Sequence, residues 1–364
     1  MPAMKQKIAV AMSGGVDSSL AAALLKEQGN EVVGFSLQLW HEKGASPSEK
    51  RLCCSFGNLA DARLIADRLG IPYYVINLEE EFRREVVDYF IREYLRGRTP
   101  NPCIWCNSRL KFNLLLQRSL LAGCHKLATG HYARVEYDRS RDRYILKKSI
   151  DSAKDQSYFL FNLTQQQIRY LTLPIGLLTK ARVRQMAETR GLPVALKEES
   201  QEVCFVSNSH YATFIDNTLD KLSTGAGLII DSNGNSIGKH KGIHHYTIGQ
   251  RRGMGIAAPH PLYVIAIDPQ NNLIVAGPNE KLYCSKLIAD NINWLSIDSL
   301  DKPVEVTAKI RYKHKGAPAL VTPRKGRGVV VEFEQPQRAI TPGQAVVFYQ
   351  GEEVIGGGWI RRAF

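Results

Sequence analysis

The sequence predicts an α/β fold with a doubly wound parallel sheet, followed by a small β-rich central domain and a C-terminal β-barrel. Up to residue 210, strand-like and helix-like segments alternate, which is typical of a parallel sheet covered by helices on both faces. Beyond Tyr211 the helical periodicity disappears, and glycine-rich turns separate short strands. After residue 280, polar and apolar side chains alternate, as they do in a barrel.

Each element of the first part has its own signal. Short apolar runs predict strands over 7–12, 31–39, 72–78 and 126–132. Apolar residues at helical spacing predict helices over 17–28, 58–69, 79–96 and 108–123, each ending at or next to a glycine. A polar β-hairpin is expected over 133–148, and further helices over 165–172 and 180–191.

The second part predicts strands only. Period-two alternation marks them over 304–312, 319–324, 328–334, 344–349 and 353–360. The changes of pattern place domain boundaries near 210 and 280. We therefore expect an α/β domain over 1–210, a small β-rich central domain over 211–280, and a β-barrel over 281–364.

Composition restricts the classes of function. The 364 residues are 44% hydrophobic and carry a formal net charge of +13, which favours a polyanionic partner. No apolar run approaches the ~20 residues of a membrane span, and the opening residues do not resemble a signal peptide, so we expect a cytoplasmic protein without membrane association. Seven cysteines at uneven spacing argue against a disulfide scaffold and leave thiol chemistry or metal ligation.

Residues 8–25, IAVAMSGGVDSSLAAALL, predict a phosphate-binding turn between a strand and a helix. Gly14 and Gly15 permit close backbone approach, so that N–H groups and the helix N-terminus converge on one anion. The lysine of a Walker A loop is missing, which disfavours kinase or GTPase chemistry. The run resembles the SGGxDS signature of PP-loop ATP pyrophosphatases, which cleave ATP between the α- and β-phosphates. The alternative is an ordinary turn capped by Asp17 or Ser18.

Two cysteine segments are candidates for thiol chemistry. RTPNPCIWCN, residues 98–107, places Cys103 and Cys106 at the start of a predicted helix, where the helix dipole and nearby cations lower a thiol pKa. A buried structural pair or half of a zinc site would give the same spacing. Cys204, in EESQEVCFV, is the other candidate, although a single cysteine in such a segment is more often a core residue.

The chain resembles the tRNA-specific 2-thiouridylase family over nearly its whole length. The matching runs are AMSGGVDSS, GRTPNPCIWCNSRLKF, ATGHYAR, KDQSYFL, SQEVCF, GKHKGIHHYTIGQRRGMGI, KIRY and AITPGQAVVFY. The resemblance implies that ATP with Mg²⁺ adenylates O2 of the wobble uridine, and that sulfur then replaces the adenylate. It further implies a Cys204 persulfide loaded by a desulfurase or relay-type donor, and a Cys106 nucleophile that ends in a disulfide with Cys204.

One position departs from the family pattern. Many members carry an acid where this chain has Cys103. Three thiols, Cys103, Cys106 and Cys204, could hold a [4Fe–4S] cluster that delivers sulfide, so the persulfide and cluster mechanisms both stay open here.

The resemblance also implies binding residues. Those for ATP are Ala11, Met12, Ser13, Gly14, Gly15, Val16, Asp17, Ser18, Leu37 and Gly130. Those for tRNA are Asn101, Pro102, Cys103, His131, Lys154, Asp155, Gln156, Arg311, Tyr312 and Gln344. Amide and aromatic groups suit an unstacked base, and cations suit phosphate. The expected partners are therefore tRNA and a persulfide donor, not DNA.

Other interpretations differ in class. A 4-thiouridine synthase or an amidotransferase would share the PP-loop, and a non-catalytic RNA-binding protein could keep the ATP fold as a scaffold. His240, His244 and His245 suggest zinc, but they lack a helical frame and an acidic partner in the sequence, which favours a basic RNA-facing loop. Cys53 and Cys54 receive no role.

Overall fold

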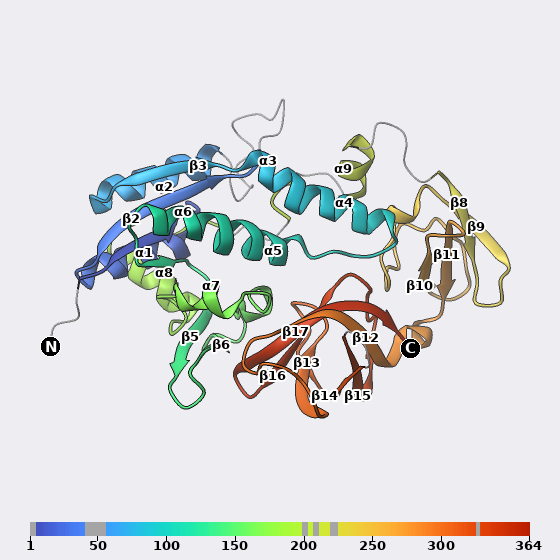
Figure 1. Ribbon diagram of the computed structural model, residues 1–364. Coiled ribbons are helices and arrows are strands. Elements are labelled where there is room, and N and C mark those ends of the chain that lie inside the picture. The colour runs from blue at the N-terminus through green and yellow to red at the C-terminus, as the bar shows by residue number, and fades with distance from the viewer. Residues whose placement is uncertain (1–4, 41–55, 199–202, 207–210, 219–224, 325–327) are drawn as a thin grey trace. The chain divides into compact units, whose positions relative to one another are not determined.

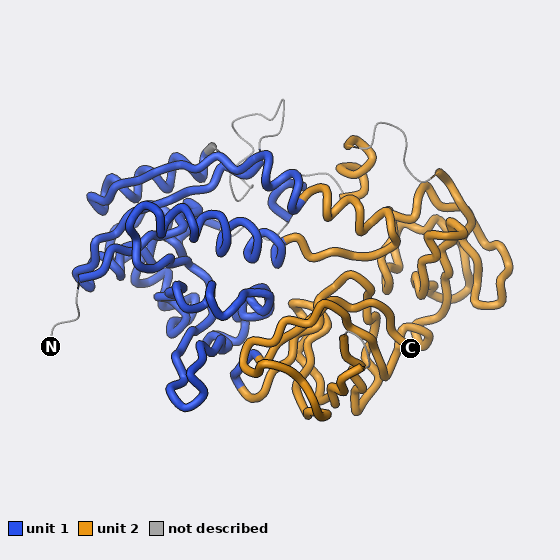
Figure 2. Tube along the Cα trace, in the orientation of Figure 1, with its two compact units in different colours: residues 1–86, 103–207, 352–354 blue, residues 87–102, 208–351, 355–364 orange. Residues whose placement is uncertain are grey.

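The computed structural model describes residues 5–40, 56–198, 203–206, 211–218, 225–324 and 328–364 (Figure 1). The chain forms two compact units (Figure 2). Unit 1 comprises residues 1–86, 103–207 and 352–354, and unit 2 comprises 87–102, 208–351 and 355–364. The segment 87–102, which the sequence analysis assigned to the catalytic domain, thus clusters with unit 2. The expected boundaries at 210 and 280 stay a prediction.

A parallel five-stranded sheet organises unit 1. Its order is β3-β2-β1-β4-β7, from β3 (Tyr73–Asn77), β2 (Glu31–Gln38), β1 (Lys7–Ala11), β4 (Lys126–Ala128) and β7 (Leu171–Thr172). Every neighbouring pair is parallel. The chain builds outward from β1 in one direction to β3 and in the other through β4. This confirms the doubly wound sheet and puts its topological switch point between β1 and β4.

Helices cover the sheet because its strands are apolar on both faces. Ile8 and Val10 of β1 pack against α1 (Val16–Glu27), α2 (Phe56–Leu69) and α8 (Lys180–Thr189). Ala9, between them, points to the opposite face and is fully buried. Both faces are therefore covered, as a parallel sheet requires.

The other helices of this part follow the predicted ranges with local differences. The predicted helix 79–96 consists of α3 (Glu79–Phe82), the π-helical η1 (Arg83–Val87) and α4 (Asp88–Leu95). The predicted helix 108–123 begins earlier, as α5 (Pro102–Trp105), the π-helical η2 (Cys106–Leu115) and α6 (Leu116–Leu121). The predicted helix 165–172 was too long, because α7 ends at Arg169 (Gln165–Arg169) and Leu171–Thr172 form strand β7.

The predicted hairpin is present in unit 1. It pairs β5 (Ala133–Asp138) with β6 (Arg143–Lys148) in antiparallel register. Glu353, from the short return of the chain to unit 1, pairs with Lys147. A 3₁₀ turn, η3 (Ser157–Phe159), follows the hairpin. Within the described residues, no helix combines the length and the apolar character that crossing a bilayer requires.

Unit 2 contains a small sheet and a barrel, as predicted. The sheet order is β10-β11-β8-β9, from β10 (Tyr263–Asp268), β11 (Leu273–Gly277), β8 (Gly227–Ile230) and β9 (Ser236–His240). Helix α9 (Tyr211–Thr218), in a part where the sequence predicted strands only, and the 3₁₀ turns η4 (Ile243–His245) and η5 (Asn279–Leu282) accompany it. Ile229, Val264 and Ile274 are fully buried in its core.

Six strands form the barrel. They are β12 (Tyr283–Trp294), β13 (Val304–Lys309), β14 (Ala317–Pro323), β15 (Val329–Arg338), β16 (Ala345–Gln350) and β17 (Glu353–Ala363). Their order is β12-β15-β14-β13-β16-β17, and pairing of β12 with β17 closes the cylinder. Alternate residues such as Leu287, Val331 and Phe348 fill the interior. Strand β12 was not among the predicted strands.

Candidate nucleotide and sulfur-transfer site

The predicted phosphate-binding turn is closed by its own side chains. It lies between the end of β1 at Ala11 and the start of α1 at Val16. The Ser18 hydroxyl accepts the Ser13 N–H at 3.1 Å and lies 3.2 Å from the Gly15 carbonyl oxygen. Gly14 has φ +67°, and a Cβ there would lie 2.1 Å from the Asn58 carbonyl oxygen. The turn is therefore preformed and accepts only glycine at residue 14.

A cavity of about 200 Å³ opens beside this turn, at the carboxyl ends of β1 and β4. Ser13, Asp17 and Ser18 supply polar groups, and Phe35, Leu37 and Leu39 supply an apolar wall. The remaining lining residues are Ala11, Met12, Asn58, Leu59, Lys111, Thr129, Gly130, His131 and Gln156. An apolar wall next to a cluster of polar groups suits a nucleotide, with the base on one side and phosphates on the other.

Most of the predicted ATP residues line this cavity. Ala11, Met12, Ser13, Asp17, Ser18, Leu37 and Gly130 do so, whereas Gly14, Gly15 and Val16 shape the turn behind it. Position 130 has no room for a side chain, because a Cβ on Gly130 would lie 2.6 Å from the Ser18 nitrogen and 2.7 Å from the Asp17 carbonyl carbon. The end of β4 thus touches the start of α1.

Lys180 is a site residue that sequence reasoning missed. It begins α8, and Thr179 caps that helix by accepting the Arg182 N–H. The Lys180 ammonium donates to both Asp17 carboxylate oxygens at 2.8 Å. The Tyr132 hydroxyl donates to the same carboxylate at 2.7 Å. Because Lys180 is 9% exposed, this pair is mostly withdrawn from water and fixes the Asp17 side chain.

Lys197 is the second missed residue. Its ammonium donates to the Gly14 carbonyl at 3.1 Å and to Asn58 Oδ1 at 2.5 Å, and it pairs with the Asp61 carboxylate. Arg184 of α8 fixes the backbone here by donating to the Lys197 carbonyl. Lys197 is therefore attached to the phosphate-binding turn through the Gly14 carbonyl and Asn58.

His131 and Gln156, predicted to contact tRNA, line the nucleotide cavity. Burial of the imidazole, with a smaller contribution from the nearby Lys111 charge, lowers the pKa of His131 well below its usual value. The His131 ring is therefore neutral at neutral pH, with Nδ1 2.7 Å from the Thr129 hydroxyl. Gln156 accepts the Tyr132 N–H at 3.0 Å. Both residues thus line the same cavity as most of the predicted ATP residues.

Asp155 does not face solvent. Its side chain is 6% exposed, and its carboxylate accepts the N–H groups of Ser149 and Ser157 and the Ser157 hydroxyl. It holds the turn on which the half-buried Lys154 and Gln156 sit.

Two cysteine-bearing segments of unit 1 contact the same short helix, α3. Cys106, 8% exposed, begins η2, and Cys103 is exposed one turn earlier. Phe205, next to the half-buried Cys204, packs on Phe82 with ring centroids 5.6 Å apart. Phe82 belongs to α3, which contacts η2. The segments of Cys106 and Cys204 thus pack on the same short helix. The other predicted cysteines, Cys53 and Cys54, lie outside the described residues.

In unit 2 the barrel holds the loop that precedes Cys103. Gln344 donates to the carbonyls of Thr99 at 2.9 Å and Pro100 at 3.3 Å. The Thr99 N–H donates to the Pro342 carbonyl, and a Cβ on Gly343 would lie 2.9 Å from that of Arg98. Asn101 is half-buried and Pro102 is buried. Three residues of the barrel therefore set the conformation of the predicted base-contacting loop.

The other predicted tRNA residues of unit 2 lie just beyond β13. Arg311 donates to the Arg338 carbonyl at 3.1 Å, and the Lys309 ammonium lies 5.9 Å from the centre of the Tyr312 ring. Arg311 and Tyr312 are half-buried, with part of each side chain open to solvent.

The histidine-rich segment differs from its interpretation as an RNA-facing loop. His240 is 1% exposed and bonds the Asn272 carbonyl oxygen through Nε2, and His244 is fully buried. Both imidazoles are therefore interior groups. The flanking Lys239 and Lys241 remain exposed.

Family models match three consecutive parts of the chain. The first, described as a tRNA methyl transferase HUP domain, covers residues 6–208. The second, a tRNA methyl transferase PRC-barrel domain, covers 212–278, and the third, an aminomethyltransferase beta-barrel domain, covers 284–360.

Curated relatives match the chain from end to end. The tRNA-specific 2-thiouridylase MnmA 2 of Caldanaerobacter subterraneus subsp. tengcongensis is 50% identical, covering 98% of both chains. The tRNA-specific 2-thiouridylase MnmA of Acetivibrio thermocellus is 49% identical over 98% of this chain and 99% of its own. That of Geobacter metallireducens is 49% identical over 99% and 98%. On this identity and coverage, the chain belongs to the tRNA-specific 2-thiouridylase (MnmA) family.

Proposed function

We propose that this protein uses ATP to replace the C2 oxygen of the wobble uridine of tRNA with sulfur, giving 2-thiouridine, AMP and diphosphate. The observation that carries the proposal is the cavity at the switch point of the sheet, where a preformed phosphate-binding turn adjoins an apolar wall. The names of the relatives, which are tRNA-specific 2-thiouridylases, support the same reaction.

The first step activates the base. The uridine O2 attacks the α-phosphorus of ATP, the bond to the bridging oxygen breaks, and diphosphate leaves with the electron pair. The N–H groups of the turn and the N-terminus of α1 favour that anion. Asp17, held by Lys180 and Tyr132, is the carboxylate in the lining to which we assign Mg²⁺, which would offset phosphate charge.

The second step delivers sulfur. A Cys204 persulfide carries the sulfur, and the Cys106 thiolate attacks Sγ of Cys204, forming a disulfide and releasing hydrosulfide. Hydrosulfide attacks C2 of the adenylated uridine, and AMP leaves with the former O2. A dithiol reductant then returns the disulfide to two thiols. Packing of both cysteine segments on α3 supports this pairing.

We assign the residues that contact tRNA as the sequence predicts. We assign contacts with the extruded base to Asn101, Pro102 and Cys103 and, independently, to His131 and Gln156, which line the cavity. Lys154, Arg311, Tyr312 and Gln344 would meet the anticodon arm, with Asp155 supporting the turn. The net charge of +13 fits a polyanionic substrate. A desulfurase or relay protein would load Cys204, in the cytoplasm, where thiols stay reduced.

Delivery of sulfide by a [4Fe–4S] cluster on Cys103, Cys106 and Cys204 receives no support from the comparisons. Iron content of anaerobically purified protein separates the two routes, with Cys103→Ala as the matched variant. The persulfide route predicts iron-free protein and a Cys103→Ala variant that still thiolates. If the Cys103→Ala variant loses both iron and activity, sulfide delivery by the cluster replaces the persulfide route.

The overall reaction is tested by mass spectrometry of nucleosides from unmodified tRNA incubated with the protein, ATP, Mg²⁺ and a persulfide donor. We expect 2-thiouridine, which should disappear when ATP is omitted or when Cys204 is changed to serine. Formation of 4-thiouridine would identify the synthase alternative. Binding of tRNA without any thiolated product would favour the non-catalytic scaffold.

A further inference from the structure

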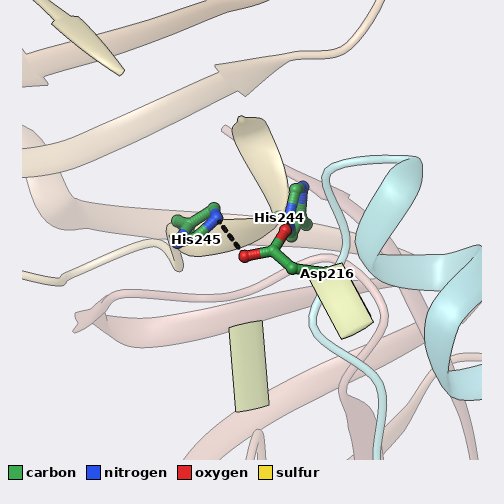
Figure 3. A group of neighbouring side chains, drawn as sticks. All are labelled: Asp216, His244 and His245. Atoms are coloured by element: carbon green, nitrogen blue, oxygen red, sulfur yellow. Dashed lines mark hydrogen bonds and ion pairs between the residues drawn. The ribbon is translucent and has the colours of Figure 1, made fainter. Parts of the chain in front are cut away.

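A compact group of metal-ligating side chains lies in unit 2, outside the nucleotide site. Asp216, His244 and His245 each offer one ligand atom, and these atoms lie within 4.8 Å of one another (Figure 3). His244 Nε2 lies 2.7 Å from Asp216 Oδ1, and His245 Nε2 lies 3.1 Å from Asp216 Oδ2. Asp216 is the acidic partner that the sequence around the histidines lacks, because it comes from α9.

The local fold explains why two successive histidines converge. Gly242, with φ +145°, turns the chain into η4, and Ile243 anchors that turn with 1% exposure in the core of the small sheet. In this 3₁₀ turn the rings of His244 and His245 lie 4.5 Å apart, tilted by 49°. Helix α9 is anchored by the buried Ala212, one turn before Asp216, and by the buried Ile215. Packing of hydrophobic residues thus fixes η4 and α9, the two elements that carry the three candidate ligands.

The three side chains differ in their exposure to solvent, which leaves one side of the group accessible. The His244 side chain is fully buried, whereas those of His245 and Asp216 are 25% and 39% exposed. A cation could therefore enter from solvent and keep a water as its fourth ligand. Two imidazoles and one carboxylate select transition metals such as Zn²⁺ over Mg²⁺ and Ca²⁺, which prefer oxygen donors.

We propose that Asp216, His244 and His245 form a binding site for a divalent transition metal ion, most simply Zn²⁺. Each imidazole must present an unprotonated Nε2, so binding releases protons wherever that nitrogen carries one in the metal-free protein. The ion would replace the hydrogen bonds to the carboxylate and fasten α9 to η4. The site is separate from the ATP chemistry, and it does not depend on the proposed thiolation.

The test is a titration of untagged, chelator-treated protein with ZnCl₂, after the cysteine thiols have been blocked with N-ethylmaleimide. Calorimetry should show one equivalent bound to the wild type. Asp216→Asn and His245→Ala should each weaken binding by about tenfold or more, since each removes one of three protein ligands. His260→Ala, which changes an exposed histidine of the same unit, should bind like the wild type.

A spectroscopic readout uses CoCl₂ in place of zinc. We expect the visible bands of a four-coordinate ion in the wild type and in His260→Ala, and their loss in Asp216→Asn. Circular dichroism checks that the variants are folded. Failure of the wild type to retain either ion, or equal retention by all four proteins, would overturn the metal site. His244 and His245 would then only contact the Asp216 carboxylate.

Discussion

The Lys180 ammonium donates to both oxygens of the Asp17 carboxylate at 2.8 Å, although 162 residues separate the two in the chain. Asp17 is in the first turn of α1, directly beside the phosphate-binding turn, and Lys180 begins α8. The mostly buried Lys180 ammonium thus pairs with the Asp17 carboxylate beside the turn where diphosphate would be held. The pair orients the Asp17 carboxylate.

We predict that Lys180→Met weakens ATP binding and lowers stability, whereas Tyr132→Phe has a smaller effect. Lys180→Met leaves the Asp17 charge, 28% exposed, without its cation, for which we expect a loss of about 1–2 kcal/mol in the free energy of unfolding. Tyr132→Phe removes one neutral donor but leaves the cation beside Asp17, so we expect a smaller loss than in Lys180→Met. Denaturant unfolding and calorimetric ATP titration measure both. Equal effects of the two changes would show that the ion pair has no special role.

Two glycines with positive φ give a matched test of the phosphate-binding turn. Gly14 has φ +67° and no room for a Cβ, whereas Gly29 has φ +84° with nothing within 4 Å of that position. Gly29→Ala should cost about 1 kcal/mol of backbone strain and leave ATP binding intact. Gly14→Ala must also displace the Asn58 backbone, so we expect loss of measurable ATP binding. Similar ATP affinities in the two variants would contradict a preformed cradle.

Lys197 should control the Cys204 segment as well as the turn. In Lys197→Met the Gly14 carbonyl, Asn58 and Asp61 lose their common donor. We expect faster alkylation of Cys204 by iodoacetamide, because an anchor seven residues away is gone, together with several-fold weaker ATP binding. Mass spectrometry of the labelled peptide gives the rate at Cys204. Arg182→Ala, an exposed change on α8, is the control and should leave both quantities unchanged.

The depressed pKa of His131 predicts a stability loss on the acid side. The unfolded chain, with an ordinary histidine pKa near 6.5, binds a proton that the folded protein excludes. Stability is therefore unaffected above that pKa and falls as the pH drops below it toward the folded value. His131→Gln should flatten this part of the curve. Denaturant unfolding between about pH 7.5 and 5.5 measures it. Burial also lowers the pKa of His314. This residue therefore supplies the pH dependence of stability that remains in the variant.

The sequence predicted the contiguous parts of the site and missed those brought together by the fold. Residues 11–18 carry their chemistry in one run, so their geometry follows from local turn and helix rules. Lys180 and Lys197 look like ordinary surface lysines until α8 is packed on α1. Strand β12 was not predicted because bulges near Cys284 and Asp290 break its alternation of polar and apolar residues.

The barrel offers the last prediction, since Gln344 ties the loop before Cys103 to β16. Gln344→Leu removes the amide that donates to the carbonyls of Thr99 and Pro100, so the loop loses a fixed conformation. Gln350→Leu is the matched control: that amide also donates to a backbone carbonyl, of Glu305 in β13, at the far end of β16. We expect Gln344→Leu to reduce thiolation at limiting tRNA by about tenfold, through a base-binding loop that is no longer preorganised, with ATP binding unchanged. Steady-state rates at low and saturating tRNA separate KM from kcat. Gln350→Leu should behave as wild type in both, and an equal loss in the two variants would assign the effect to barrel stability instead of the loop.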